Sequence, residues 1–242
     1  MKRRVIVYGD IHGCLKELKK LREKIKVTQN DLEISVGDFL NKGPKSVKTL
    51  RYIEKNHIFS VIGNNEEKII QYYYEYKKDP KKCAKNIKKY ELKIVKKLNT
   101  RDIHFLKSLP YFIKIKNLTV VHGGIRIGLK LNHNLSEQDK KDITLIRFYN
   151  DKFEMVPYSD KKNLIHFWSD HYNGSEGFVV FGHHPFKKPK ISKYAIGIDT
   201  GCVYGGKLTA VVFNMDKKKV DTRHYKIYQQ KAKSDYFAKA CR

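Results

Sequence analysis

Two hydrophobic periodicities alternate over the first 65 residues, and this alternation limits the folds that the chain can adopt. Three short runs rich in β-branched residues each end at a glycine, as buried strands often do: "RRVIVYG", "LEISVGD" and "IFSVIGN". Between them lie two stretches whose apolar residues follow helical spacing, "CLKELKKLREKI" and "SVKTLRYIEK". A β-α-β-α-β order predicts a parallel sheet with right-handed crossovers, in which ligands gather at the carboxyl ends of the strands.

The rest of the chain predicts more helices and then a second group of strands. Residues 66–108 are rich in lysine and carry a helical pattern, whereas from residue 111 onward the period changes to two. The stretch "YFIKIKNLTVVHGG" predicts a hairpin that turns at Lys116–Asn117, and "GFVVFGHH", "YAIGIDTG" and "KLTAVVFNMDKKKVDTRHYKIY" predict further strands. We therefore expect an α/β fold with two sheets and helices outside them, followed by a loose basic tail at 229–242.

Length and composition favour a single domain without a membrane span. A chain of 242 residues with 40% hydrophobic content can bury one sizeable core. No apolar run approaches the ~20 residues of a membrane helix. Only Val5–Tyr8 separate the basic start from Gly9, and a secretory signal needs a longer apolar segment, so we expect a cytoplasmic protein. The four cysteines show no CxxC spacing and are expected to stay reduced.

The formal net charge of +26 has two interpretations. A polyanionic partner such as RNA, polyphosphate or a membrane surface would account for it. Of the 51 basic residues, however, 42 are lysine and 9 are arginine, and arginine is the preferred residue for phosphate recognition. A general compositional bias toward lysine therefore stays open as the second interpretation.

Side chains that can bind metal ions follow the predicted strands. They lie in the glycine-bounded stretches "GDIHG", "GDFLNKGP", "GNNE", "HGG" and "GHHP", where glycine lets the backbone approach a ligand closely. Asp, Asn and His together suit ions such as Mn²⁺, Fe²⁺ or Zn²⁺. We predict two divalent ions that share Asp38, hold a hydroxide between them and clamp a phosphoryl group. The candidate ligands are Asp10, His12, Asp38, Asn64, His122, His183 and the adjacent His184.

The order of these five stretches resembles that of the phosphoprotein phosphatase family of binuclear metallophosphoesterases. The resemblance covers most of the chain and implies the calcineurin-like fold, a central β-sandwich flanked by helices. It implies one metallophosphoesterase domain over residues 1–228, with a helical insertion at about 66–108, followed by the basic tail at 229–242. Mn²⁺ is the favoured ion, with Fe²⁺, Zn²⁺, Co²⁺ and Mg²⁺ as alternatives. The implied ligands are Asp10, His12 and Asp38 for the first ion, and Asp38, Asn64, His122 and His183 for the second.

Later stretches narrow the branch of the family. "TLIRFYN" (144–150) and "IDTGCVYGGKLTAV" (198–211) resemble the symmetrical diadenosine tetraphosphatases, in which the arginine that matches Arg147 is expected to hold phosphate. "NKGP", in place of the usual "DRGP", resembles the ApaH-like phosphatases, a group associated with nucleotide polyphosphates, polyphosphate and RNA 5′ ends. "WSD" (168–170) is similar to a stretch of the protein phosphatases.

Three positions depart from the family pattern, and they affect catalysis. Asn65 and Asn41 stand where most members carry a general-acid histidine and the aspartate that orients it, and an amide exchanges no proton near neutral pH. Losing a general acid costs about 10²–10⁴ in rate where the leaving group needs one. Lys42 replaces an arginine and offers a point charge without the bidentate fork. We expect Arg147 or Arg126 to compensate in holding phosphate, with His184 as a further candidate for substrate contact.

The leaving-group argument favours a hydrolase of phosphoanhydrides. A departing phosphate or nucleotide is already stabilised as an anion, whereas a serine alkoxide needs a proton. We therefore expect a nucleotide polyphosphate, dinucleotide or RNA 5′ end as the substrate. The alternatives are a serine, threonine or tyrosine protein phosphatase, a polyphosphatase whose lysine-rich helices guide the chain, and a catalytically impaired protein that only binds polyanions.

Overall fold

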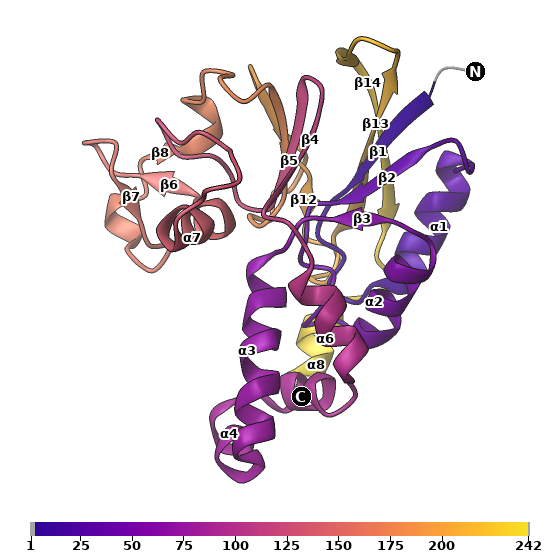
Figure 1. Ribbon diagram of the computed structural model, residues 1–242, viewed down its shortest axis with the longest axis vertical. Helices are drawn as coiled ribbons and strands as arrows, with labels where there is room; N and C mark the ends of the chain where they lie inside the picture. The colour runs from indigo at the N-terminus through magenta and orange to yellow at the C-terminus, as the bar shows by residue number, and fades with distance from the viewer. Residues whose placement is uncertain (1–2, 242) are drawn as a thin grey trace.

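The computed structural model describes residues 3–241, which form two packed β-sheets, a small third sheet and helices on the outside (Figure 1). The strands are β1 Arg3–Tyr8, β2 Leu32–Ser35, β3 Phe59–Ser60, β4 Phe112–Ile115, β5 Leu118–Val121, β6 Phe148–Tyr149, β7 Met155–Val156, β8 His166–Phe167, β9 Phe178–Phe181, β10 Lys190–Ser192, β11 Ala195–Gly197, β12 Asp199–Thr200, β13 Lys207–Met215 and β14 Val220–Lys231. The helices are α1 Leu15–Ile25, α2 Ser46–Lys55, α3 Asn64–Lys78, α4 Pro80–Asn86, α5 Lys89–Val95, α6 Thr100–Lys107, α7 Glu137–Leu145 and α8 Tyr236–Ala240.

The first sheet has the strand order β12-β13-β1-β2-β3, with β14 pairing on the outer side of β13. Strands β1, β2 and β3 are parallel, which confirms the β-α-β-α-β prediction for the first part of the chain. Strand β13 runs antiparallel to β1 over the whole length of β1. The carboxyl ends of β1, β2 and β3 therefore lie at one edge of this sheet.

The second sheet has the order β10-β11-β9-β5-β4. Strands β4 and β5 form the predicted hairpin, in which Ile115 pairs with Leu118 across the turn at Lys116–Asn117. Strands β5, β9 and β11 are parallel to one another, so their carboxyl ends also share one edge. The third sheet, β7-β6-β8, lies beside α7, and neither it nor α7 is predicted by the sequence patterns.

The two large sheets form the predicted β-sandwich because their strands alternate in the direction of their side chains. In β1, Val5 and Val7 belong to the core between the sheets, together with Val120 and Val180 of the second sheet. Ile6 of β1 belongs instead to the core beneath the helices. Helix α1 packs on this outer face against β13 and β14. The sandwich flanked by helices is therefore confirmed.

The lysine-rich segment 66–108 is helical, as predicted, and it forms most of α3 to α6, which lie together beyond one end of the sheets (Figure 1). The residues after 228 differ from the expected loose tail. Strand β14 continues to Lys231, and α8 follows it. The Tyr236 hydroxyl donates to Glu17 over 2.7 Å, and the backbone N–H of Tyr236 donates to the carbonyl of Val203. These contacts fix the segment because they give its polar groups partners on the body of the protein.

A search of residues 3–241 finds no helix with the length and apolar character that a membrane span requires.

Candidate metal centre

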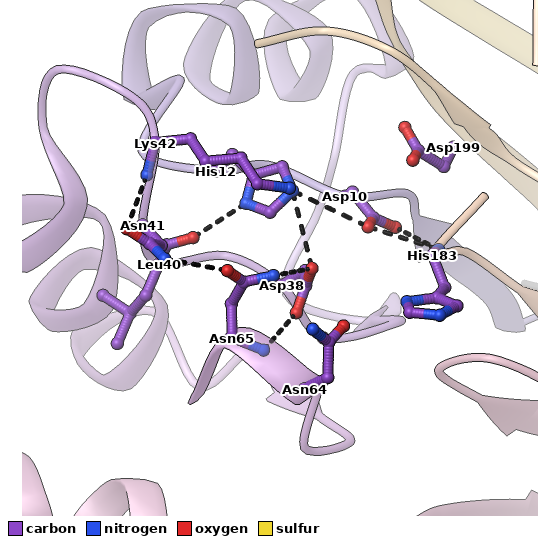
Figure 2. A network of polar contacts seen from close by, with 12 residues as sticks. Asp10, His12, Asp38, Leu40, Asn41, Lys42, Asn64, Asn65, His183 and Asp199 are labelled. Atoms are coloured by element: carbon purple, nitrogen blue, oxygen red, sulfur yellow. Dashed lines mark hydrogen bonds and ion pairs between the residues drawn. The ribbon is translucent and has the colours of Figure 1, made fainter. Parts of the chain in front are cut away.

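The candidate site lies where loops from both large sheets meet at the carboxyl ends of their strands. The loops that follow β1, β2 and β3 come from the first sheet, and those that follow β5 and β9 come from the second. Figure 2 shows the side chains of Asp10, His12, Asn64 and His183 grouped around Asp38. The structure thus brings together residues that are up to 173 positions apart in the sequence.

The backbone of the site is held in an uncommon conformation. Five of its non-glycine residues have a positive φ, a region that costs most side chains free energy and that clusters at functional sites. The N–H groups of His12 and Gly13 donate to the carbonyls of Asp38 and Phe39 over 2.8 Å, which ties the first loop to the second. The five residues are His12 (44°), Asp38 (49°), Asn41 (69°), Lys42 (58°) and His183 (68°).

Two groups of three side chains are close enough to hold one metal ion each. In the first group, ligand atoms of Asp10, His12 and Asp38 all lie within 4.8 Å of one another. In the second group, those of Asp38, His122 and His183 do so as well. All five side chains are buried. Asp38 belongs to both groups, which is the arrangement that a carboxylate shared by two ions requires.

Asn64 lies beside the second group. Its Oδ1 atom is 3.0 Å from Nε2 of His122, and the residue begins α3 directly after Gly63. The Nδ1 atom of His183 is 3.1 Å from the same Nε2 atom. The Nε2 atom of His183 is buried and has no hydrogen-bond partner within residues 3–241. Since Nδ1 is the ring nitrogen that faces His122, it is the atom that His183 would offer to a metal ion.

The tautomers of His12 and His122 are set by backbone carbonyls. A carbonyl oxygen can only accept, so Nδ1 of His12 donates to Leu40 and Nδ1 of His122 donates to Val36, each over 2.8 Å. In a neutral ring the Nε2 atom then presents a lone pair to the site. Histidines that bind metals commonly have this second bond, which orients the ring.

The facing atoms of these rings and of Asp38 leave a place for a cation. Nε2 of His12 is 3.5 Å from Oδ2 of Asp38, and Nε2 of His122 is 3.4 Å from Oδ1. Burial and the nearby Lys42 lower the pKa of His12 to about 3, and burial lowers the pKa of His122. At neutral pH neither ring has a proton at Nε2 to donate to Asp38, so nitrogen lone pairs face the carboxylate, and a cation between them would be favourable. The residues present therefore fit metal ions.

Lys42 lies against the first group of ligands. Its Nζ atom is 3.1 Å from Nε2 of His12 and 5.4 Å from the ring centroid of Tyr204. Burial opposes the charge on this side chain, but Asp38 and Tyr204 outweigh the burial and raise the pKa of Lys42. Lys42 thus keeps its proton at neutral pH and places a positive charge at the site, as its replacement of the family arginine leads one to expect.

The two asparagines that replace the acid–base pair contact each other. Nδ2 of Asn41 donates to Oδ1 of Asn65 over 2.8 Å, and Nδ2 of Asn65 donates to Oδ2 of Asp38 (Figure 2). Nδ2 of Asn41 also lies 3.2 Å from Oε1 of Glu91 on α5, and the same oxygen accepts from Lys68 over 2.8 Å. The chain of bonds fixes the amide orientation of Asn65, so its NH₂ group faces Asp38. Glu91 is a supporting residue that sequence reasoning did not find.

Glu66 supports the loop that carries Asp38. Its Oε2 atom accepts from the N–H groups of Asp38 and Gly63 over 2.6 and 3.0 Å, and its Oε1 atom accepts from Leu40 over 2.9 Å. One carboxylate thus satisfies three buried backbone donors that the turn leaves without partners. The sequence signal is the glutamate at the third position of α3, which is typical of a capping residue.

Asp199 is a second residue that the sequence analysis did not assign. It is 4% exposed, and its Oδ1 atom accepts from the N–H of Gly201 over 2.9 Å. Figure 2 shows it facing the site near Asp10. Burial and the charge of Asp199 raise the pKa of Asp10. The glycine-bounded "GIDTG" is the same kind of signal as "GDIHG" and would have identified it.

The two arginines expected to hold phosphate have different surroundings. Arg147 is half-buried, its Nη2 atom is 3.5 Å from the carbonyl of His183, and its buried Nε atom has no partner in the described part of the chain. Arg126 instead forms ion pairs with Asp139 at 2.6 Å and Asp142 at 2.7 Å, both on α7. Two carboxylates neutralise its guanidinium, so the structure does not support Arg126 as a phosphate ligand.

His184 points away from the two ligand groups into an aromatic cluster. Its ring centroid lies 4.9 Å from that of Phe186, 5.5 Å from that of Phe167 and 5.6 Å from that of Phe148. Burial and the charge of Arg147 lower the pKa of His184 to about 4. At neutral pH the imidazole is therefore uncharged, and it cannot replace the missing general acid at Asn65.

Comparisons with known proteins place the chain among phosphoesterases. The model of the calcineurin-like phosphoesterase family matches residues 3–222. Similar curated proteins include the bis(5′-nucleosyl)-tetraphosphatase PrpE [asymmetrical] of Oceanobacillus iheyensis, 27% identical over 87% of this chain and 88% of the relative. The protein of the same name from Bacillus subtilis (strain 168) is 30% identical over 86% of this chain and 89% of the relative. These names specify asymmetrical cleavage, whereas two of the sequence stretches resemble the symmetrical branch.

Solved structures agree with the sequence relatives. The crystal structure of a candidate diadenosine tetraphosphatase has a TM-score of 0.75 and 25% identity, and the match covers 95% of this chain and 93% of that one. A serine/threonine phosphatase from Saccharomyces cerevisiae, 17% identical with a TM-score of 0.59, covers 96% of this chain and 80% of its own, and shares the fold. The family match over most of the length, the two ligand groups and the sandwich fold lead to one conclusion: the chain belongs to the calcineurin-like phosphoesterase family, a family of metal-dependent enzymes.

Proposed function

We propose that this chain hydrolyses phosphoanhydride bonds in dinucleoside polyphosphates with two divalent metal ions, of which Mn²⁺ is favoured. The observation that carries the proposal is the pair of ligand groups that share Asp38, next to an Asn65 amide that replaces a proton donor. The names of the curated relatives support the dinucleoside substrate, since they are bis(5′-nucleosyl)-tetraphosphatases.

Each ligand group would hold one ion. Asp10 and His12 would bind the first ion, Asn64, His122 and His183 would bind the second, and Asp38 would bind both. When bound, such ions lower the pKa of water and neutralise phosphoryl oxygens. The backbone bonds at Nδ1 of His12 and His122 keep both rings oriented before an ion arrives. The protein therefore supplies a preorganised set of ligands.

Lys42 and Arg147 would hold the substrate phosphates. The lone pair of His12 that now accepts from Lys42 cannot serve a metal ion as well. Metal binding would therefore free the Lys42 ammonium to contact a phosphoryl oxygen. Arg147 has a buried Nε donor without a partner among the described residues, and a phosphate oxygen would satisfy it. Together the two side chains supply a point charge and a planar fork.

The leaving group explains why the site can work without a histidine at position 65. The Asn65 NH₂ group donates a hydrogen bond to Asp38 but gives up no proton. A nucleotide leaves as a stabilised phosphate anion, because its last ionisation lies near pH ~6. A serine alkoxide has no such stabilisation and needs protonation, which is worth about 10²–10⁴ in rate. The site therefore favours anhydrides over phosphoserine.

A substrate panel tests the proposal. Diadenosine tetraphosphate, a 5′-triphosphorylated RNA, inorganic polyphosphate and a phosphoserine peptide are offered with Mn²⁺, Mg²⁺, Zn²⁺ or Co²⁺. We expect the highest kcat/KM on diadenosine tetraphosphate with Mn²⁺, and no turnover by a folded Asp38→Asn variant. Equal or faster turnover of the peptide would contradict the proposal in favour of a protein phosphatase. Faster turnover of the RNA would indicate RNA 5′ ends as the substrate. No turnover with any ion would indicate a protein that binds polyanions without cleaving them.

A further inference from the structure

A cavity of about 770 Å³ opens beside the metal centre. Its walls come from residues 42–48, from Arg51 on α2, from α5 and Lys97 beyond its end, and from α8. Lys42 joins the cavity to the site, since it lines the cavity while its Nζ atom is 3.1 Å from Nε2 of His12. A group that extends from a phosphate held at Lys42 would therefore enter this cavity, which the proposed function does not use.

The lining is positive and contains no carboxylate. Its charged residues are Lys42, Lys45, Lys48, Arg51, Lys89, Lys93, Lys97 and Lys239. Arg51 pairs with Asp102 at 2.8 Å, whereas none of the seven lysines forms an ion pair within the described range 3–241. We call this cavity the lysine cavity, after its seven lysines. A concave surface of one sign concentrates the electrostatic potential and attracts ions of the opposite sign.

The lysine bias of the chain does not account for this lining. The whole sequence has 25 acidic residues for 51 basic ones, so an average surface would show about half as many carboxylates as cations. A second cavity, of about 830 Å³ between α2 and α6, is not depleted in carboxylates, because Glu54 and Asp102 line it beside Arg51, Lys55 and Arg101. A third cavity, beside β14, also has no carboxylate but is lined by only three cations, Arg4, Arg223 and Lys226, whereas eight cations line the cavity that adjoins the metal centre.

We propose that the lysine cavity binds a linear phosphate chain that continues from the phosphate group at Lys42. This inference rests on the proposed function, because it names the part of an anhydride substrate that lies beyond the cleaved bond. Regularly spaced negative charges match lysines distributed along one wall, and lysine binds phosphate as a point charge. RNA fits less well, because single strands need aromatic platforms for their bases, and Tyr90 is the one aromatic side chain in the lining.

Two matched variants test the inference by binding. The first variant is Lys89→Gln, Lys93→Gln and Lys97→Gln, three exposed residues of the lysine cavity. The control is Lys81→Gln, Lys82→Gln and Lys85→Gln, three exposed residues of α4 that do not line the cavity. Both variants lose three positive charges from exposed surface. Calorimetric titration with inorganic polyphosphate of defined length at low salt measures the affinity, and thermal melting checks that both variants fold.

We expect the first variant to bind polyphosphate on the order of tenfold more weakly than the control, because three exposed ion pairs are lost. In turnover assays with diadenosine tetra- and hexaphosphate, the ratio of the KM for the longer chain to the KM for the shorter should rise in the first variant alone. The KM ratio for the nucleotides can rise while the two variants bind inorganic polyphosphate equally well. That result would show that the phosphate chain in the cavity belongs to a nucleotide.

Other outcomes overturn the inference. Equal polyphosphate affinity of the two variants, together with an unchanged KM ratio for the two nucleotides, would show that the lysines act only through net charge. A 5′-hydroxyl oligoribonucleotide that binds as tightly as polyphosphate, through the same three lysines, would assign the cavity to RNA. Absence of polyphosphate binding by the unmodified protein would also reject it. Because binding is measured without turnover, loss of the proposed activity and loss of the cavity's role give different results.

Discussion

Asn41 lies in the loop after β2 and Asn65 in the first turn of α3, yet their amides contact each other, at positions where the family resemblance implies an acid–base pair. The two replacements therefore match, because the NH₂ group of Asn41 satisfies the carbonyl oxygen of Asn65. We predict that Asn65→His combined with Asn41→Asp raises turnover of p-nitrophenyl phosphate or a phosphoserine peptide by up to about 10²-fold, because a histidine held by a carboxylate can act as a general acid. Turnover of diadenosine tetraphosphate should change much less. Steady-state kinetics on both substrates measure the difference.

The single variants provide the control for this prediction. Asn65→His alone places an imidazole beside the Asn41 amide, which does not stabilise its charged form. Its gain should therefore be smaller than that of the double variant, and the coupling in a double-mutant cycle should be positive. Equal gains in the single and double variants would show that position 41 does not support position 65.

Gly182 keeps the space in which the Asp10 carboxylate lies. A Cβ atom at position 182 would lie 2.0 Å from Oδ1 of Asp10 and 2.6 Å from Cγ2 of Val36, so the carboxylate would have to move. We predict that Gly182→Ala weakens Mn²⁺ binding about 10- to 100-fold, the usual effect of disturbing the support of a metal ligand. Metal content after dialysis against limiting Mn²⁺ measures the effect.

Gly128→Asn is a suitable control because no atom lies within 4 Å of the added Cβ, and asparagine tolerates the left-handed φ of +77°. It should retain its metal. Full metal content in Gly182→Ala would indicate that Asp10 is not needed to hold an ion.

For individual residues, the sequence predicts candidate metal ligands better than it predicts which side chains contact one another in the fold. The six ligand positions follow from one local signal, a polar residue beside glycine at the end of a strand. Asp199 carries the same signal, but its stretch was interpreted as a strand and as part of the resemblance to the symmetrical diadenosine tetraphosphatases, and no ligand was assigned in it. Arg126 could not be judged from sequence, because its two carboxylate partners lie 13 and 16 residues away on a helix that was not predicted.

Among the elements, helix α3 supports the metal site from its first turn. The Glu66 carboxylate accepts from three buried N–H groups, those of Asp38, Leu40 and Gly63. We predict that Glu66→Ala lowers the free energy of unfolding by about 3 kcal/mol or more, because each buried donor without a partner costs roughly 1–3 kcal/mol. Urea denaturation measures the change. The exposed Glu75→Ala on the same helix should stay within about 0.5 kcal/mol of the unmodified protein. Similar values for the two variants would contradict the supporting role of Glu66.

Helix α8 holds the end of the chain against the body of the protein. Removing residues 234–242 eliminates the bond from Tyr236 to Glu17 and the edge contact of Phe237 with Tyr204 at 5.5 Å. We predict a loss of about 2 kcal/mol, which corresponds to a fall in Tm of about 4–8 °C for a chain of this size. Thermal melting by circular dichroism measures it. Tyr236→Phe should give a smaller fall in Tm, since it removes only one hydrogen bond. An unchanged Tm after truncation would instead support the loose tail expected from the sequence.

Element prediction depended on the strength of the local pattern. The stretches that became β1, α1, β2 and α2 have strong periodicity, and their types and approximate bounds were predicted. Helix α7 has the sequence "EQDKKDITL", in which only two residues are strongly apolar, so its helical period is too weak to identify. The two-residue strands β6, β7 and β8 are shorter than any periodicity can show. Helix α8 depends on long-range contacts with Glu17 and Val203, which no local pattern contains.

For the molecule as a whole, the net charge of +26 acts on stability and on binding in opposite directions. Like charges repel in the compact state, and salt screens the repulsion over about 10 Å at 0.1 M. We predict that raising NaCl from 20 to 200 mM stabilises the protein by about 1 kcal/mol, or roughly 2–4 °C in Tm. The same change should weaken polyphosphate binding. KCl should act equally, because screening depends on ionic strength. A Tm that falls with both salts would contradict the repulsion argument.

Strand β14 gives the abundance of lysine a further consequence. It forms the outer edge of the six-stranded sheet, and an exposed edge can template the addition of a strand from another molecule. Arg223, Lys226 and Lys231 project from this edge strand and are exposed. Two copies that met edge to edge would bring these cations together, and charged side chains on edge strands are a common protection against such pairing. The lysine-rich composition that places Lys42 at the metal centre thus also protects this sheet edge against aggregation.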